Sequence, residues 1–491
     1  MHETFYFYDL ETSGLNPRLD RIMQFAGQRT DADFNPIGEP TNLLVALAED
    51  TLPSPGAIMV TGITPQQART DGLTEREFCE FFMREIATPN TTILGYNSVR
   101  FDDEFIRNTL WRNFYDPYEW QWKDGRSRWD LLDVVRMTRA LRPEGIEWPV
   151  TADGHSTNRL ELITKLNQIE HEHAHDALAD VVALIEVTKL IKQRQPQLFD
   201  FLYRMRTKQA VQQLVSLEHP QPFVYASGRY SSQSEKTTVA YPIAPAPNGN
   251  VLVFDLRYNL DELLDQEKAG RAQLTGAKNT ASAAALKRKF SELEPWERHY
   301  FPIVKKLQFN RCPAVAPLGV LEKADGWQKL QLSREQVEQN LQSLQAHPEF
   351  VQRMAEIKRP DYPPSEDAES ALYDGFLDDH DRLLCATVRA NDADLLADCH
   401  PNFADERLPE LLLHYKAKNF PSALAADEVE KWEAYRTKRL ARQSETFLKE
   451  IARIQQSLAR DETFGNKTPD ECAFLVEELL LWYESLQPGD Y

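Results

Sequence analysis

The stretch Phe5-Tyr6-Phe7-Tyr8-Asp9-Leu10-Glu11-Thr12-Ser13-Gly14 begins with an apolar, aromatic run and ends in two acids and a turn signal. The run is too short to span a membrane, and its aromatic content favours a buried strand. Side chains alternate along a strand, so Asp9 and Glu11 point to the same face. Two neighbouring carboxylates repel each other unless a cation lies between them. The stretch therefore predicts a strand end that holds a hard divalent metal, with a solvated strand end as the alternative.

The composition is that of an ordinary globular protein. The 491 residues are 42% hydrophobic and 27% charged, and this length allows about three domains of about 150 residues each. No apolar run approaches the ~20 residues of a membrane-spanning helix, and the N-terminus has no signal-peptide pattern. The five cysteines form no CxxC pair, which favours reduced thiols over a disulfide framework or a zinc site. We therefore expect a cytoplasmic protein that is not bound to a membrane.

The negative charge is unevenly distributed along the chain. The formal net charge is −20, and residues 361–491 hold 28 acidic and 14 basic residues. The first 360 residues are nearly balanced, with 48 acidic and 42 basic residues. Binding of nucleic acid needs local cations rather than a basic protein, so the net charge does not exclude it.

The first part of the chain alternates strands and helices. Three further strands are predicted at 22–28, 42–45 and 91–94, the first two continuing the opening strand as an antiparallel start. Apolar spacing and caps predict helices at 74–86, from Asp102 to Trp111, from Asp130 to Leu141, from Arg159 to Leu166, and from about Asp180 to Lys192. This pattern indicates an α/β domain that ends near 193–196.

Further candidate ligands follow at helix starts. Asp102 lies near a helix N-terminus, where a capping role is the alternative to metal binding. His175 and Asp180 are five residues apart, so a loop and the first helical turn could direct both into one cleft. A lone histidine is more often structural, but its pKa near 6.5 suits acid–base chemistry if a site is present. Four carboxylates and a histidine suit phosphodiester hydrolysis by two divalent metals about 3.5–4 Å apart.

The stretch from Tyr115 to Trp129 interleaves aromatic and basic residues. Such a pattern suits base stacking and phosphate contacts with a single strand. Packing of the same aromatic residues into the core explains the pattern equally well.

The remaining chain divides into two parts. Strand-like runs and turns after residue 196 predict a small β barrel or sandwich, with a strand-like run at 307–310 and a polar insertion around 270–289. A proline-containing linker at 359–365 precedes a region of helices that we interpret as a compact bundle. We therefore predict domains at 1–196, 197–358 and 361–491.

Three motifs, Asp9-x-Glu11-Thr12, Asn97-x3-Phe101-Asp102 and His175-x4-Asp180, resemble those of the DEDDh family of 3′→5′ exonucleases. Longer runs resemble the bacterial exonuclease I family across most of the chain, and they are at 95–104, 127–134, 141–146, 174–180, 373–376 and 418–421. The match is weakest at about 269–296, where this chain is longer than the family pattern.

The resemblance implies an α/β fold class: a ribonuclease H-like exonuclease domain with a mixed sheet, an SH3-like β domain with the insertion near 269–296, and a C-terminal α-helical domain. In this family the three enclose a groove for single-stranded DNA. The implied activity is processive 3′→5′ hydrolysis of single-stranded DNA to 5′-mononucleotides, in DNA repair and recombination. The implied cofactor is two Mg²⁺ ions, with Mn²⁺ as a substitute.

The resemblance also implies partners and residue roles. Asp9, Glu11 and Asp180 would hold the catalytic metal, Asp9 and Asp102 would serve the second, and His175 would be the general base. The remaining implied contacts are those of Glu11 and Arg159 with the terminal nucleotide, and of Arg107, Tyr118 and Trp122 with the strand. The family also binds the acidic C-terminal tail of single-strand DNA-binding protein, and we assign Arg142 with neighbouring cations to that surface. We expect a monomer.

Three alternatives remain open at this point. The first is an exonuclease of the same class that acts on RNA or proofreads, because the 2′-OH contacts that select RNA cannot be seen in a sequence. The second is a non-catalytic single-strand-binding scaffold whose acids are caps and solvated strand ends. The third is a nuclease specific for double strands.

Overall fold

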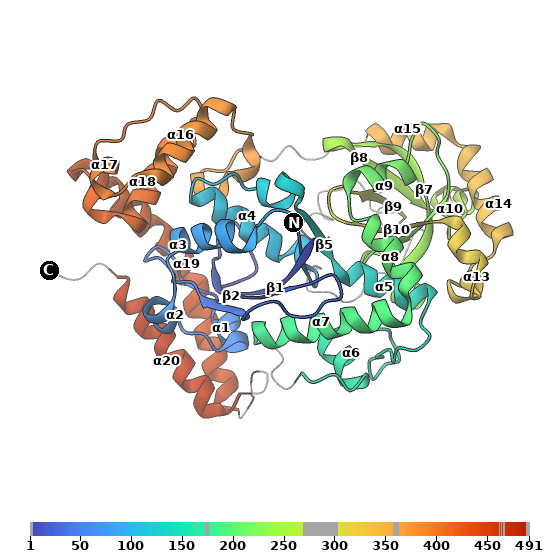
Figure 1. Ribbon diagram of the computed structural model, residues 1–491, viewed down its shortest axis with the longest axis horizontal. Coiled ribbons are helices and arrows are strands. Elements are labelled where there is room, and N and C mark those ends of the chain that lie inside the picture. Colours follow the sequence, from blue (N-terminus) through green and yellow to red (C-terminus); the bar gives the residue numbers. More distant parts are fainter. Residues whose placement is uncertain are drawn as a thin grey trace. The chain divides into compact units, whose positions relative to one another are not determined.

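The computed structural model describes residues 3–171, 176–268, 303–356, 363–460, 462, 464 and 467–487 (Figure 1). His175 and the predicted insertion at 269–296 lie outside these residues. The chain forms two compact units: a first unit of Met1–Arg128, His171–Leu184 and Tyr362–Tyr491, and a second unit of Trp129–Glu170 and Ile185–Asp361.

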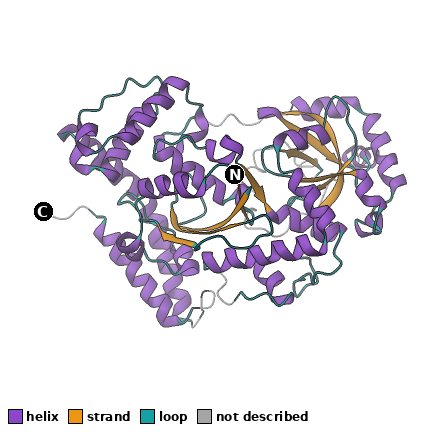
Figure 2. Ribbon diagram, in the orientation of Figure 1, coloured by secondary structure: helices purple, strands orange, loops and turns teal. Residues whose placement is uncertain are grey.

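The N-terminal sheet has the strand order β3-β2-β1-β4-β5 (Figure 2). β1 is antiparallel to β2 and parallel to β4, and β2 is antiparallel to β3, so the sheet is mixed as expected. The strands are β1 Thr4–Thr12, β2 Ile22–Thr30, β3 Thr41–Leu44, β4 Thr91–Gly95 and β5 Ser127–Asp130. Asp9 lies opposite Ala26 and Glu11 opposite Gln24, and the register shifts between Glu11 and Thr12. The acids therefore lie where the regular pairing of β1 ends.

Short helices connect and cover this sheet. Their bounds are α1 Pro55–Thr61, α2 Pro65–Asp71, α3 Glu75–Phe81 and α4 Asp102–Arg112, and α7 spans Ala177–Arg194. Thr74 and Glu77 form the expected capping box at the start of α3. A single helix over 74–86 was expected, but α3 ends at Phe81 and a π-helix, Phe82–Ile86, follows it. The apolar spacing of Phe78, Phe82 and Ile86 fits both forms, so the pattern did not distinguish them.

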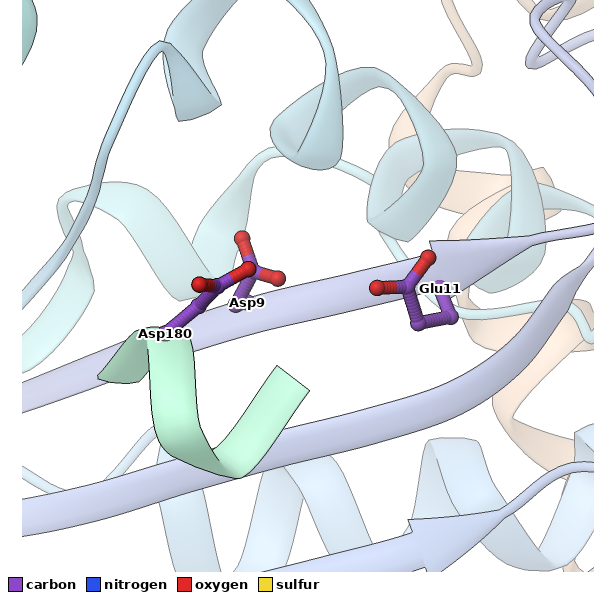
Figure 3. Close-up of side chains that lie close together, drawn as sticks. All are labelled: Asp9, Glu11 and Asp180. Atoms are coloured by element: carbon purple, nitrogen blue, oxygen red, sulfur yellow. The ribbon is translucent and has the colours of Figure 1, made fainter. Parts of the chain in front are cut away.

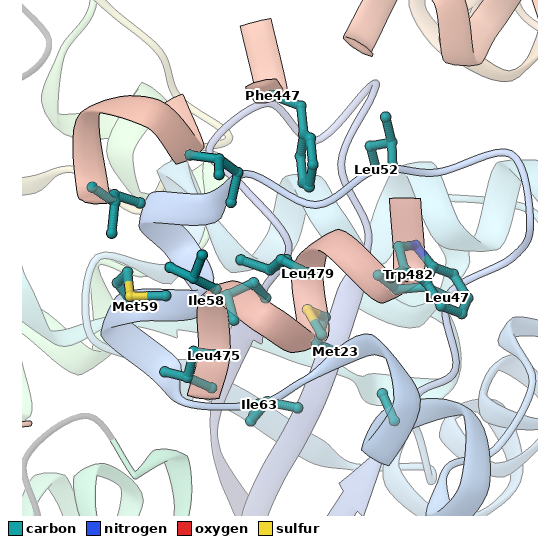
Figure 4. Close-up of a cluster of buried hydrophobic side chains, with 14 of the residues drawn as sticks. Met23, Leu47, Leu52, Ile58, Met59, Ile63, Phe447, Leu475, Leu479 and Trp482 are labelled. Atoms are coloured by element: carbon teal, nitrogen blue, oxygen red, sulfur yellow. The ribbon is translucent and has the colours of Figure 1, made fainter. Parts of the chain in front are cut away.

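The C-terminal helices pack on the N-terminal part of the first unit. They are α16 Asp379–Ala390, α17 Ala393–Ala397, α18 Leu408–Asn419, α19 Ala426–Leu458 and α20 Pro469–Ser485. One buried cluster joins Met23 of β2 and Ile58 of α1 with Leu479 and Trp482 of α20 (Figure 4). Each fully buried side chain of this kind stabilises the fold by about 1.5–3 kcal/mol. Within residues 363–460, 462, 464 and 467–487 the regular elements are helices, as predicted.

The second unit contains an antiparallel sheet of its own, in the order β10-β6-β7-β8-β9. The strands are β6 Phe223–Ala226, β7 Thr237–Ala246, β8 Asn250–Asp255, β9 Val304–Leu307 and β10 Ala314–Pro317. The strand expected at 307–310 is wrong in position, because β9 ends at Leu307 and a turn follows. The helices are α5 Leu131–Leu141, α6 Leu160–Leu166, α8 Pro196–Arg204, α9 Lys208–Leu214, α10 Leu260–Lys268, α13 Gly326–Lys329, α14 Arg334–Gln345 and α15 Pro348–Glu356.

Within the described ranges no helix combines the length and apolarity that crossing a membrane requires.

Candidate metal centre

Three carboxylates of the first unit converge at the end of β1. One oxygen from each of Asp9, Glu11 and Asp180 lies within 4.8 Å of the other two. Figure 3 shows Asp9 and Glu11 on the same face of β1, with Asp180 reaching them from the first turn of α7. The structure thus brings together the two strand acids and the helix acid that the sequence pattern selected.

The start of α7 is fixed by a cap of its own. The Asp176 carboxylate accepts hydrogen bonds from the backbone N–H groups of Leu178 (3.1 Å) and Ala179 (3.0 Å). Such a cap satisfies amides that the helix itself leaves free. It also sets the first turn of the helix, which carries Asp180.

Burial and mutual repulsion raise the pKa values of the strand acids. Burial raises the pKa of Asp9 well above its usual value, and the charges of Asp102 and Asp180 raise it further. Burial raises the pKa of Glu11 to about 9, with Asp9 and Asp180 adding to the effect and Lys467 opposing it. These carboxylates therefore form a partly buried group with excess negative charge. The donor set consists of hard oxygens, which fits a divalent cation of the Mg²⁺ or Mn²⁺ type.

Asp102 is the first residue of α4 and its side chain is buried. The N-cap residue of α4 is Phe101, whose side chain makes no capping hydrogen bond. The neighbouring Asp103 accepts hydrogen bonds from the Tyr8 hydroxyl (2.6 Å) and from the Arg128 guanidinium. Asp102 is thus the first helical residue rather than the N-cap residue, and its charge acts on Asp9.

One neighbour of this centre was missed by the sequence analysis. The ring nitrogen Nε2 of His171 lies 2.5 Å from Oδ1 of Asp180, and its side chain is buried. Nothing in the spacing of the histidine cluster distinguishes His171 from the residues around it. The predicted general base, His175, lies outside the described residues.

The predicted strand-contact residues of the first unit differ in exposure. The Trp122 side chain is 64% exposed, whereas Trp120 is fully buried. Core packing therefore describes Trp120, and stacking of bases on Trp122 stays a prediction. Arg107 is buried and donates to Glu104 (2.7 Å) and Gln121 (2.9 Å). Its guanidinium carbon lies 5.8 Å from the centre of the Tyr118 ring.

Two further predicted contacts belong to the second unit. Arg159 precedes α6, is largely exposed and pairs with Glu161. Arg142 follows α5 and donates to the carbonyl oxygens of Leu141 (2.6 Å) and Val320 (2.9 Å).

Family models match the chain in three successive segments. These are Exonuclease at 6–188, Exonuclease I SH3-like domain at 206–358 and Exonuclease I C-terminal domain at 366–486. Exodeoxyribonuclease I of Haemophilus influenzae is 40% identical over 458 residues, covering 92% of this chain and 93% of the relative. The chain belongs to the exonuclease I family. Exodeoxyribonuclease I of Escherichia coli is 39% identical over 439 residues, covering 88% of this chain and 89% of the relative.

Solved structures of the exonuclease I family share the whole fold. The zinc-bound form of the E. coli ExoI–ssDNA complex has a TM-score of 0.87 at 36% identity, covering 99% of this chain and 100% of that chain. A structure of SSB/Exonuclease I in complex with the inhibitor CFAM has a TM-score of 0.84 at 36% identity, with the same coverage. The family fold therefore comprises an exonuclease domain with a mixed sheet, an SH3-like domain and a C-terminal helical domain, as the sequence predicted.

Proposed function

We propose that this chain is a processive 3′→5′ exodeoxyribonuclease that hydrolyses single-stranded DNA to 5′-mononucleotides with Mg²⁺. The observation that carries the proposal is the convergence of Asp9, Glu11 and Asp180 in a partly buried, electronegative centre. The family membership and the ssDNA complex of the E. coli relative support the substrate.

We assign a separate role in the reaction to each residue of the metal centre. Asp9, Glu11 and Asp180 would hold one ion, and Asp9 and Asp102 the other. When bound, two divalent ions neutralise the scissile phosphate, lower the pKa of a water and stabilise the leaving oxygen. His175 would accept the proton of the attacking water as general base. Glu11 and Arg159 would position the terminal nucleotide.

Recognition of the strand is proposed to depend on stacking and backbone charge. The exposed Trp122 and the half-buried Tyr118 offer aromatic faces, and Arg107 lies beside Tyr118. Stacking tolerates every base, so it gives binding without sequence preference.

Further parts of the proposal concern partners and setting. The SSB/Exonuclease I structure supports the acidic tail of single-strand DNA-binding protein as a partner, with Arg142 in the docking surface. We propose that the enzyme acts in DNA repair and recombination. We further propose that it works in the cytoplasm and as a monomer. The proposed domains are 1–196, 197–358 and 361–491, and the family matches follow the same order.

The decisive experiment compares end-blocked oligonucleotides. Purified protein is incubated with single-stranded DNA carrying a 3′ or a 5′ block, with Mg²⁺ or with EDTA. We expect a 3′ block to stop digestion, a 5′ block to leave it intact, and EDTA to abolish it. Digestion stopped by the 5′ block alone would overturn the polarity.

Comparing the degradation of matched substrates distinguishes this function from the alternative functions. Single-stranded DNA should be degraded faster than an RNA of the same sequence and faster than the blunt duplex. Preferential loss of the RNA would favour an exoribonuclease, and equal digestion of the duplex would favour a double-strand nuclease. Asp9→Ala should abolish hydrolysis while binding of the single strand remains, whereas a scaffold would show no hydrolysis to abolish.

A further inference from the structure

The β1–β2 loop, residues 13–21, leaves the metal-binding strand two residues after Glu11. Its base is closed by two hydrogen bonds: the Ser13 N–H donates to the Arg21 carbonyl (2.8 Å), and the Arg21 N–H donates to the Ser13 hydroxyl (2.9 Å). Inside the loop, the Asn16 N–H donates to the Asp20 carboxylate (2.7 Å). The loop is thus an ordered extension of the strand that carries Asp9 and Glu11.

A glycine and an exposed leucine follow each other at the start of this loop. A Cβ atom added at Gly14 would lie 2.4 Å from a carboxylate oxygen of Asp20, so the Asp20 side chain would have to shift. Leu15 follows directly and is 79% exposed, whereas Ser13 and Arg21 at the base are buried. The loop therefore presents an apolar side chain to solvent four residues after Glu11.

Three residues of the C-terminal helical region hold the second half of this loop. Nη2 of Arg439 donates to the Leu19 carbonyl (3.0 Å), and the Ser370 hydroxyl donates to the Arg18 carbonyl (3.3 Å). The Glu369 carboxylate accepts from Nη2 of Arg21 (2.6 Å). These contacts join segments that lie about 350 to 420 positions apart in the sequence.

Two of the three anchoring residues, Arg439 and Glu369, are themselves held on other sides. Arg439 is buried and also donates to the Asp50 carbonyl (3.1 Å) and to the Asp367 carboxylate (3.0 Å). Glu369 is buried and pairs with Lys418 as well as with Arg21. A fixed guanidinium fork keeps its geometry better than a flexible ammonium group does. The anchors therefore form a rigid support rather than a set of surface contacts.

We propose that Arg439, Ser370 and Glu369 are positioning residues for hydrolysis: they hold the β1–β2 loop, and with it the end of β1 at which Asp9 and Glu11 hold metal. The inference rests on the proposed function. The terminal nucleotide must lie at this end of β1, because the scissile phosphate must reach the metal ligands. Displacement of a positioning element by about 1 Å can lower a rate about a hundredfold. The C-terminal region thus contributes to catalysis without touching the reacting atoms.

The test compares Arg439→Gln with a matched control, Lys416→Gln. Lys416 is an equally buried cation of the same region, and its hydrogen bonds run to Glu428, away from the loop. Both changes remove one buried charge, so both should lower the unfolding midpoint. We expect only Arg439→Gln to lower kcat on single-stranded DNA, by about tenfold or more, with KM changing less than about threefold. Assays are run where each variant is folded.

Limited trypsin digestion gives a readout that is independent of activity. The exposed Arg18–Leu19 bond is a tryptic site within the loop, and mass spectrometry identifies its cleavage. We expect this cleavage to accelerate about tenfold in Arg439→Gln and to stay at the wild-type rate in Lys416→Gln, because protease accessibility follows local opening. Arg439→Lys, which keeps the charge, should recover part of both effects.

A milder variant covers the case in which Arg439→Gln does not fold. Ser370→Ala removes a single hydroxyl and should show the same two effects at a few-fold size. Equal kcat values for Arg439→Gln and Lys416→Gln, or a wild-type kcat in Ser370→Ala whose loop is cleaved faster, would overturn the inference. An inactive wild-type protein would instead refute the proposed function, and the trypsin rates would still show whether the anchors hold the loop.

Discussion

Two groups of acids in the first unit have pKa values that are shifted in opposite directions. At the metal centre, burial raises the pKa of Asp9 and of Glu11, and the neighbouring acids raise both further. In a second group, which we call the ionic network, burial also acts to raise the pKa of Asp50 and Glu369. Lys418 and the arginines more than offset it, so both pKa values are lowered.

The difference lies in the partners. Glu369 has Arg21 at 2.6 Å and Lys418 beside it, and Asp50 has Lys418 at 2.9 Å. Asp9 and Glu11 share their space with Asp180 instead. Buried acids that carry their own cations have their charge compensated within the fold, whereas buried acids that face one another need an added cation. Burial alone therefore does not identify a metal site, and the sign of the pKa shift separates the two groups.

Asp9→Asn should give the largest effect. The substitution keeps the shape and removes one charge, so we expect hydrolysis of single-stranded DNA to fall by roughly a thousandfold or more, because charge stabilisation at the phosphate is lost. The metal-free variant should be at least as stable as the wild type, because a repulsive charge is gone. Kinetics with Mg²⁺ measure the rate of hydrolysis, and thermal unfolding in EDTA measures the stability of the metal-free protein. A variant that is active, or markedly less stable than the wild type, would place Asp9 with the network acids.

Glu369→Gln is the matched change in the ionic network. It also replaces one buried carboxylate by an amide, but it takes from Arg21 and Lys418 the closer of the two acids that they share, and leaves them the other, Asp50. Removing one partner of a buried ion pair costs about 3–5 kcal/mol. We therefore expect a large loss in the free energy of unfolding, measured by urea titration. Stability equal to that of Asp9→Asn would show that the two groups do not differ as described.

The metal centre was more predictable from the sequence than the ionic network. Asp9 and Glu11 share a strand, and Asp102 and Asp180 stand at helix starts, so local periodicity and short motifs select them. Asp50, Glu369 and Arg439 carry no motif and meet only through tertiary packing. His171 was missed for the same reason, since no periodic pattern links it to Asp180, nine positions further along the chain.

The fold shows the same limit. Strand periodicity and capping residues predicted β1, β2, β3, β4, the start of α3, and the helices α4 and α7. The end of α3, the position of β9 and the packing of α20 against α1 depend on contacts between distant segments. Sequence patterns report local geometry well, but they do not report which helix faces meet.

The pH dependence of stability should have opposite signs in the two groups. The folded-state pKa of Glu11, about 9, is raised above its unfolded value. Its contribution to stability is therefore fully present below about pH 4.3, the unfolded value, and is lost as the pH rises toward 9. The lowered pKa of Asp50 gives a contribution that is present above about pH 4 and is lost as the pH falls.

Variants isolate these two contributions. The first quantity is the unfolding temperature of the wild type minus that of Glu11→Gln. In EDTA this difference should fall by a few degrees between pH 5 and pH 9. Mg²⁺ should make the fall smaller, because the ion takes the place of the protons on the carboxylates. The difference between wild type and Asp50→Asn should shrink below about pH 4. A flat first difference would mean that Glu11 is not held in a repulsive environment.

The smallest effect on stability is expected for an exposed ion pair outside both groups of acids. This pair tests whether burial causes the difference between the metal centre and the ionic network. Lys431 and Asp427 lie one turn apart on α19, with Nζ 2.7 Å from Oδ2, closer than Lys418 is to Asp50. Both side chains are more than 60% exposed, so water screens the attraction and the ionised groups lose little hydration on pairing. We expect Lys431→Ala to leave the unfolding midpoint within experimental error at low and high salt. A loss of stability comparable with that of Glu369→Gln would mean that short distance, rather than burial and shared partners, determines the strength of these ion pairs. The contrast between the two acid groups would then need a different cause.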